Sequence, residues 1–335
     1  MTRVTSLSLC AACVLVAQTV DDGIRAFHEG RYADAVKMLA PLRGEPVGKA
    51  FHAIALAASG QCKAAEPDLR EALRQSGAAK RFAGLALTQC LIARKDYDAA
   101  APVLAALRQD FPKDADVLYE TARVHMRAWD EAVADMFRNA PASFRVNQLS
   151  AEVFETQSRF SEAASEYRKA IDKSPATLNL HYRLGRALLL ESHDPKALAT
   201  AQKEFEAELS LNPNDAAAEY QIGQILIARQ QPVQAAKRFE KAYALSPDFP
   251  EAYVARAKLH MDAKQYNESL PLLRKAVELQ PALESAHYSL MLAYRNLGRS
   301  TDALKEKAEL DRLQKPPEGE FTEFLKKLGE KPKTP

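Results

Sequence analysis

Residues 161–175 read SEAASEYRKAIDKSP, and residues 233–247 read VQAAKRFEKAYALSP. Both stretches have alanine at the third position, an aromatic residue four positions later and a proline at the end. The remaining residues are mostly good helix formers, and proline blocks the continuation of a helix. Each stretch therefore predicts a helix that ends just before its proline.

The same layout recurs along the chain with a period of about 34 residues. A small residue stands twelve positions before each regular proline and a large apolar residue eight positions before it. The small residues are Ala100, Ala163, Ala201, Ala235 and Ser269, and the large ones are Leu104, Tyr167, Phe205, Phe239 and Leu273. A preceding helix carries its own small residue, and we expect the two helices to approach where both are small. A fixed period with two amphipathic helices per unit predicts an all-α solenoid.

The stretch YQIGQILIARQQPVQAAKRFEKAYALSP (220–247) resembles the tetratricopeptide repeat family. The residues on the family pattern are Ile222, Gly223, Leu226, Ala235, Phe239, Ala242 and Pro247. The tryptophan usual near the start of the first helix is absent. The resemblance covers most of the chain and implies a right-handed superhelical solenoid of antiparallel helix pairs, of a secreted bacterial type.

The repeat array is predicted over residues 18–315, in about nine units. The units begin near residues 16, 46, 81, 115, 144, 178, 216, 250 and 284. The unit at 115 is about five residues short, so HMRAWDEAVADMF (125–137) leaves no room for a turn between its helices. The unit at 178 is about four residues longer, and Asp194-Pro195 predicts a helix start after a longer turn.

The two ends of the chain differ from the array. Arg3 followed by an apolar run predicts a signal peptide over residues 1–17, too short to span a membrane. We therefore expect export to the periplasm or secretion, and we favour this over lipoprotein anchoring at Cys13. Apolar residues at helical spacing predict a capping helix over residues 316–328, and residues 329–335 are expected to be a disordered tail.

Cys62 and Cys90 would remain after removal of the signal peptide. In an oxidising compartment, an even number of cysteines permits one disulfide. The alternative is two separate buried thiols that act as small hydrophobic residues.

The sequence gives little support for catalysis, and an enzyme is the weakest of the functional interpretations. It has no phosphate-binding loop, no nucleophile motif, and no histidine pair at metal-ligand spacing. We therefore predict no enzyme activity, no cofactor and no metal site. The 46 basic and 44 acidic residues nearly balance, which does not favour nucleic acid as a partner.

A binding role is better supported. Tyrosine recurs at one position of the first helices, followed one turn later by arginine or glutamine. The predicted groove residues are Tyr119, Arg123, Tyr182, Arg186, Tyr220, Gln224 and Tyr288. Tyrosine provides apolar area and a hydroxyl, and arginine binds carboxylates, so the row suits an extended or helical peptide with acidic groups. The competing interpretation is that these tyrosines only pack against the neighbouring unit.

These features predict a non-catalytic scaffold that binds a protein or peptide segment in a concave groove. The alternative is an envelope-associated assembly factor, of the pilus or outer-membrane biogenesis type, in which the array is mainly structural.

Overall fold

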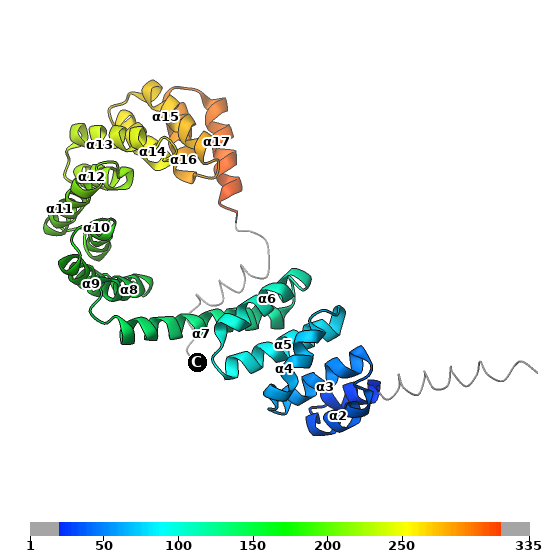
Figure 1. Ribbon diagram of the computed structural model, residues 1–335. Helices are drawn as coiled ribbons and strands as arrows, with labels where there is room; N and C mark the ends of the chain where they lie inside the picture. Colours follow the sequence, from blue (N-terminus) through cyan, green and yellow to red (C-terminus); the bar gives the residue numbers. More distant parts are fainter. Residues whose placement is uncertain (1–19, 316–335) are drawn as a thin grey trace, which may run out of the picture. The chain divides into compact units, whose positions relative to one another are not determined.

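A computed structural model of the chain describes residues 20–315. This part of the chain is all-α and contains no strand, and its helices pack mainly in consecutive pairs, as predicted for a solenoid (Figure 1). The predicted signal peptide, capping helix and tail lie outside the described residues and stay predictions. None of the described helices combines the length and apolarity needed to cross a membrane. The chain divides into two compact units, unit 1 (Met1–Pro141) and unit 2 (Ala142–Pro335).

The described part of unit 1 begins with a helix over residues 20–28. It continues with α2 (Tyr32–Leu39), the short 3₁₀ helix η1 (Ala40–Leu42), α3 (Pro46–Ala58), α4 (Cys62–Ala72), α5 (Gly77–Ala93), α6 (Tyr97–Asp110) and α7 (Ala115–Asn139).

Unit 2 consists of five helix pairs in its described part. They are α8 (Phe144–Thr156) with α9 (Phe160–Lys173), α10 (Leu180–Glu191) with α11 (Pro195–Leu211), α12 (Ala216–Ala228) with α13 (Pro232–Leu245), α14 (Pro250–Asp262) with α15 (Tyr266–Leu279), and α16 (Glu284–Asn296) with α17 (Ser300–Leu313). Within this unit, α8, α10, α12 and α14 lie on the inner side of the curve (Figure 1). We call this inner surface the first-helix face.

The repeated residues that predicted the second helices form the core. All five small residues at the predicted position are fully buried, and the large residues four positions later are at most 1% exposed. Tyr167, Phe205 and Phe239 are among the largest fully buried side chains of the described chain. The repeat in the sequence is therefore a repeat of interior packing.

The turns inside the pairs share a backbone feature that the sequence pattern did not reveal. Most of them contain one residue with a left-handed conformation, at φ between 58° and 84°. These residues are Gly30, Gly60, Lys95, Ser158, Gln230, Lys264 and Gly298. The following amide donates back to the first helix, as Gln231 N does to Leu226 O at 2.8 Å. This pattern satisfies carbonyl groups at the end of the first helix.

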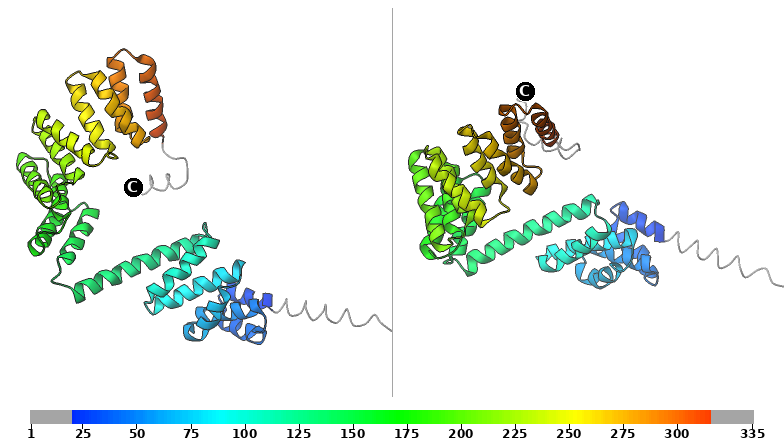
Figure 2. Two further views of the ribbon diagram at one scale, coloured as in Figure 1. Left: turned by 45° about the horizontal axis from the view of Figure 1, so that its top comes forward. Right: turned by 90° about the horizontal axis from the view of Figure 1, so that it is seen from above.

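The unit predicted at residue 115 differs from the expected helix pair. Residues 115–139 form the single uninterrupted helix α7 (Figure 2). It is 25 residues long, and Trp129 lies in its second half. The sequence between Val124 and Asn139 contains no glycine or proline, so nothing stops the helix where a turn is needed. The shortened unit has therefore lost its turn completely.

The unit predicted at residue 178 is longer for a different reason than expected. Helix α11 starts at Pro195, and the Asp194 carboxylate caps it by accepting from the amides of Lys196 and Ala197, as the sequence predicted. The turn, however, has three residues, as it does between α12 and α13. The added length lies partly in α11, which has 17 residues where α13 has 14.

Candidate functional site

The predicted tyrosine row falls on first helices in both units. Tyr119 and Arg123 lie on α7 of unit 1, and the other predicted residues lie on α10, α12 and α16 of unit 2. Tyr119 and Tyr288 are 63% and 52% exposed, while Tyr182 and Tyr220 are half-buried. The four tyrosines therefore have two different environments.

Tyr182 and Arg186 contribute to a pocket between α8 and α10. Its volume is about 550 Å³, and no aspartate or glutamate is among its lining residues. It is lined by Arg145, Gln148, Thr177, Leu178, Asn179, Tyr182, Arg183 and Arg186. We call it the arginine pocket. Three arginines thus line one open cavity on the first-helix face.

The three arginines of this pocket differ in their partners. Arg183 Nη1 lies 3.7 Å from Glu152 Oε1, 3.6 Å from Glu155 Oε2 and 3.5 Å from the Tyr167 hydroxyl. These distances are long, so Arg183 is shared among weak partners.

Arg145 and Arg186 form no ion pair within residues 20–315, and both are exposed. Arg145 donates to Gln148 Oε1 at 2.7 Å, and its guanidinium lies 4.6 Å from the centroid of the Phe144 ring. Because two of the three positive charges lack a carboxylate, the pocket has a local excess of positive charge.

A buried carboxylate fixes the helix that carries most of this pocket. Glu208 of α11 is fully buried, and it accepts from Asn179 N at 2.7 Å and from Tyr182 N at 3.3 Å. These amides belong to the unpaired donors at the start of α10. Glu208 thus holds the end of α10 from which Tyr182 and Arg183 project.

Tyr220 and Gln224 contribute to a second pocket, between α12 and α14, of about 350 Å³. It is lined by Tyr220, Gln224, Ile227, Phe239, Glu251, Val254, Ala255, Lys258, Leu259, Asp262 and Ser285. We call it the tyrosine pocket. Burial raises the pKa of the Tyr220 phenol, so this hydroxyl stays protonated and can donate at neutral pH. The tyrosine pocket combines apolar walls with charges of both signs.

The competing interpretation, that the tyrosines pack within the fold, also describes part of what they do. The Tyr182 ring lies 5.6 Å from that of Phe205, and the Tyr220 ring lies 5.7 Å from that of Phe239 and 5.1 Å from that of Phe249. Each tyrosine thus contacts aromatic residues of the fold and also lines a pocket. Packing and binding are therefore compatible roles at these two positions.

Two parts of the predicted row are not brought into these pockets. Tyr288 on α16 lines neither of them. In unit 1, the Arg123 guanidinium lies 5.6 Å from the centroid of the Tyr119 ring, and Arg123 Nη1 donates to Glu120 Oε1 at 2.9 Å. Of the predicted groove residues, Tyr182, Arg186, Tyr220 and Gln224 line the two pockets of unit 2.

Sequence reasoning missed Arg183 and Lys258 as pocket residues. The search followed only the position one turn after each tyrosine, where Arg186 and Gln224 stand. Arg183 follows Tyr182 directly and reaches the same cavity from an adjacent position on α10. A search over both neighbouring faces of each first helix would have found it.

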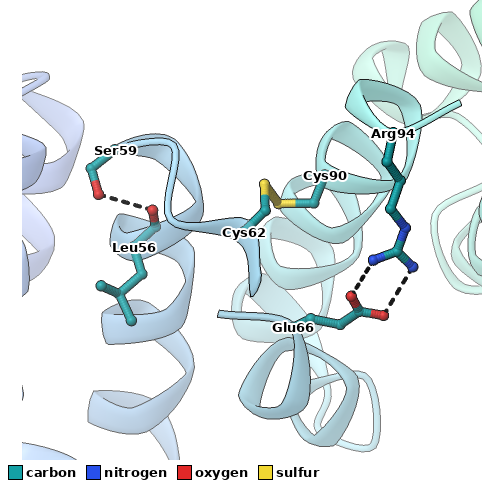
Figure 3. The surroundings of a disulfide bond; sticks show 6 residues. All are labelled: Leu56, Ser59, Cys62, Glu66, Cys90 and Arg94. Carbon is teal, nitrogen blue, oxygen red and sulfur yellow. Dashed lines mark hydrogen bonds and ion pairs between the residues drawn. A yellow bond between two sulfur atoms is a disulfide. The ribbon is translucent and has the colours of Figure 1, made fainter. Parts of the chain in front are cut away.

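Cys62 and Cys90 are joined by a disulfide in unit 1, with their Cα atoms 5.4 Å apart (Figure 3). Cys62 is the first residue of α4, and Cys90 lies near the end of α5. Close by, the two Arg94 Nη groups donate to the two carboxylate oxygens of Glu66 at 2.5 and 3.2 Å (Figure 3). The disulfide and this ion pair both connect α4 to the helix that follows it.

An apolar pocket of about 520 Å³ lies beside the disulfide and was not predicted. Phe27, Tyr32 and Phe82 line it, and the rings of Phe27 and Phe82 are 6.2 Å apart in an edge-to-face arrangement. Gln89 is its main polar side chain. This pocket contains no residue from the predicted groove.

The histidines at the repeated first-helix position have structural partners. His181 Nδ1 lies 2.7 Å from Glu204 Oε2, and His287 Nδ1 lies 2.7 Å from Glu306 Oε2. Each bond joins the first and second helices of one pair. Within the described residues, no group of three or more histidines, cysteines or carboxylates could hold a metal ion.

Solved structures and family models both match parts of this chain. Among solved structures, YrrB, described as "a TPR protein with an unusual peptide-binding site", is 18% identical over 58% of this chain and 98% of its own, with a TM-score of 0.43. MamA from Desulfovibrio magneticus RS-1, from residue 41 to its end, is 20% identical over 52% of this chain and 97% of its own, with a TM-score of 0.45. At these identities and TM-scores, the comparison does not indicate that this chain binds what those proteins bind.

Two segments of unit 2 match family models described as tetratricopeptide repeat, residues 149–204 and residues 226–294. The first begins within α8 and ends within α11, and the second extends from α12 to α16. Together with the consecutive helix pairs, these two matches support the tetratricopeptide repeat family for this chain.

Proposed function

We propose that this chain is a non-catalytic protein-interaction scaffold, and that unit 2 holds an acidic segment of a partner protein against its first-helix face. The observation that carries the proposal is the arginine pocket, in which three arginines line a cavity without a carboxylate. The tetratricopeptide repeat matches support an interaction role in general. The arginine pocket indicates, in addition, that the bound segment of the partner is acidic.

A carboxylate fits the arginine pocket better than other groups do. Guanidinium groups form paired hydrogen bonds with carboxylates, and these bonds are stronger than those between neutral groups. Arg145 and Arg186 have no ion pair to break within residues 20–315, so binding costs little rearrangement of existing pairs. The half-buried Tyr182 ring supplies apolar contact at the edge of the same cavity.

The tyrosine pocket extends the same surface along the array. Tyr220 and Gln224 occupy on α12 the places that Tyr182 and Arg186 occupy on α10. Lys258 and the apolar wall formed by Val254 and Leu259 suit a side chain farther along the same segment. An extended segment with an acidic residue at one end and an apolar residue beyond it therefore matches the two pockets in order.

The acidic character of the segment can be tested with a defined probe. Binding of a fluorescein-labelled hexaglutamate peptide to the full chain would be followed by fluorescence anisotropy, with hexaglutamine as the neutral comparison. We expect only the acidic peptide to bind, and Arg186→Ala to weaken it about tenfold. Raising the salt from about 50 to about 300 mM should weaken it further, since the charges are solvent-exposed.

The matched control is Arg168→Ala, which removes the same charge from an exposed position on α9, a second helix. This variant should bind the acidic peptide as the unmodified chain does. Equal loss in both variants would show attraction by net charge alone, and equal binding of both peptides would remove the case for a carboxylate site.

We also propose that the chain is exported, to the periplasm or the outside of the cell. The Cys62–Cys90 disulfide supports this, because disulfides persist in oxidising compartments. Fractionation of cells that produce the full chain would test it, with the oxidised protein expected outside the cytoplasm. Recovery in a washed membrane fraction would instead favour the envelope-associated assembly role.

A further inference from the structure

The second half of α7 contributes no buried residue to unit 1. The buried residues of α7 are Val117, Glu120, Thr121 and Val124, all in its first half. Residues 125–139 continue the helix for about 22 Å, at 1.5 Å per residue. Glu131 still lies 3.8 Å from Lys95 in the turn between α5 and α6, and the end of α7 extends beyond these two helices (Figure 2). Helical segments of this length are marginal in water unless an apolar face is covered. We therefore expect another surface to cover the apolar side of this half of α7.

An apolar stripe runs along the uncovered side of α7. Its residues alternate at spacings of three and four, which places them on one face of a helix. They are Tyr119, Ala122, Met126, Trp129, Val133 and Met136, with Phe137 beside the last. We call these residues the α7 stripe. Met126, Trp129 and Phe137 are 56%, 52% and 45% exposed, which is unusual for such large side chains.

Several charges on the other sides of α7 are paired, although Arg127 has no ion-pair partner within residues 20–315. Arg138 contacts the carboxylates of both Asp135 and Glu131, and Glu131 also lies 3.8 Å from Lys95 Nζ. Asp130, which borders the stripe, has no ion-pair partner within residues 20–315. Within the described residues, Asp130 is therefore an unpaired charge at the edge of the stripe.

We infer that the α7 stripe docks against the α7 stripe of a second copy of this chain, with the two helices antiparallel. A two-fold axis near the middle of the stripe then pairs Met126 with the partner's Trp129, and Ala122 with the partner's Val133. Tyr119 meets the partner's Met136 in the outermost layer. By the symmetry of the pair, each contact occurs twice.

Antiparallel pairing suits these side chains better than parallel pairing does. A parallel pair in register would set Trp129 against the partner's Trp129 and Ala122 against the partner's Ala122, which crowds one layer and leaves a gap in another. In the antiparallel pair, every layer combines side chains of different kinds and none repeats the same residue.

Charge complementarity points to the same arrangement. Arg123 and Asp130 occupy equivalent flanking positions one heptad apart on the stripe. In the antiparallel pair, Arg123 lies beside the partner's Asp130, so the aspartate without a partner gains one on each side of the dimer. Arg123 already donates to Glu120 and Tyr119 lies beneath it, so its side chain is held at the edge of the stripe.

The oligomeric state of the full oxidised chain tests the proposal. Sedimentation equilibrium between about 1 and about 200 µM should show a reversible monomer–dimer equilibrium. Trp129 is the only tryptophan, so its emission should shift to shorter wavelength as the concentration rises. Trp129→Asp should raise the dissociation constant at least tenfold. The control Val233→Asp, at a 74% exposed apolar position on α13, should leave it unchanged.

A charge exchange tests the antiparallel geometry. Arg123→Asp and Asp130→Arg should each weaken the dimer, and the variant with both changes should restore it, because the pair is re-formed with its signs reversed. Circular dichroism would verify that the variants keep their helix content. A chain that stays monomeric at about 200 µM overturns the proposal, whatever covers the stripe in the monomer. A dimer that tolerates Trp129→Asp overturns it equally.

Discussion

Gly185 of α10 lies directly against the ring of Phe205 of α11. A Cβ atom added at Gly185 would come within 2.8 Å of Phe205 Cε1, and one added at Gly84 would come within 2.6 Å of a Leu107 methyl carbon. Gly223 stands in the same relation to Phe239. We expected pairs of helices to approach where both present small residues. In these pairs, a glycine on the first helix instead packs against a large side chain of the second helix.

Gly185→Ala should therefore destabilise unit 2. Alanine favours helix over glycine by up to about 1 kcal/mol, but overpacking a close contact costs about 1–3 kcal/mol. We expect a net loss of about 1 kcal/mol, seen as a lower urea midpoint by circular dichroism. Adding Phe205→Leu should recover part of it. The control is Gly44→Ala, because a Cβ atom added at Gly44 would have no neighbouring atom within 4 Å. This variant should change the urea midpoint little. A higher midpoint for Gly185→Ala would contradict this packing.

The interior of the array could be predicted from the sequence because packing repeats with the chain. Buried positions such as Ala163 and Tyr167 accept few residue types, so they leave a periodic signal. The turn residues could not be found in this way. Gly298 is a recognisable turn residue, whereas Gln230 and Lys264 adopt the same left-handed conformation with no cue from composition.

The candidate site was only partly predictable for a related reason. Tyr182 and Arg186 were found because they share a repeated helix position. Arg145 and Arg183 join them in the arginine pocket from two different helix positions, and only the packing of α8 beside α10 brings them together. The single continuous helix α7 was missed because it results from the lack of glycine and proline between Val124 and Asn139. A search for periodic residues does not register such a lack.

Loss of the Cys62–Cys90 disulfide should destabilise unit 1. The two cysteines are 28 residues apart, and closing a loop of that length in the unfolded chain is worth about 3–4 kcal/mol in the chain-entropy model. Adding reductant should lower the denaturation midpoint and raise the intact mass by two hydrogens. The variant with both Cys62→Ser and Cys90→Ser should resemble the reduced protein and should not respond to reductant. A midpoint indifferent to reductant, despite the mass change, would contradict this expectation.

Removal of the Glu208 carboxylate should loosen the start of α10. In Glu208→Ala, the amides of Asn179 and Tyr182 lose their acceptor in a buried place, which costs about 1–3 kcal/mol. We expect faster hydrogen exchange at these two amides and weaker binding of the acidic peptide probe. Glu206→Ala, which removes an exposed carboxylate from the same helix, is the control and should change stability by less than about 0.5 kcal/mol. Unchanged exchange at Asn179 and Tyr182 would show that Glu208 does not hold the helix end.

Acidification should destabilise unit 1 through His52. This side chain is 6% exposed, and its Nδ1 atom has no hydrogen-bond partner. Burial, reinforced by the charge of Arg43, lowers the pKa of His52 below its usual value of 6.5, while Asp68 acts in the opposite direction. At a pH well above 6.5, His52 is neutral in both the folded and the unfolded chain. As the pH falls below 6.5, the unfolded chain takes up the proton first, and stability is lost until the folded pKa is reached.

The variant His52→Leu isolates this effect. Thermal unfolding of the variant and of the unmodified chain would be measured between about pH 7.5 and pH 5.5. This interval lies above the range in which most carboxylates titrate. The unmodified chain should lose more stability over this interval than the variant does, because leucine takes up no proton when the chain unfolds. His193→Gln, at an exposed histidine in unit 2, should lose as much as the unmodified chain. Parallel pH profiles for the unmodified chain and His52→Leu would show that His52 is protonated as easily in the folded protein as in the unfolded one.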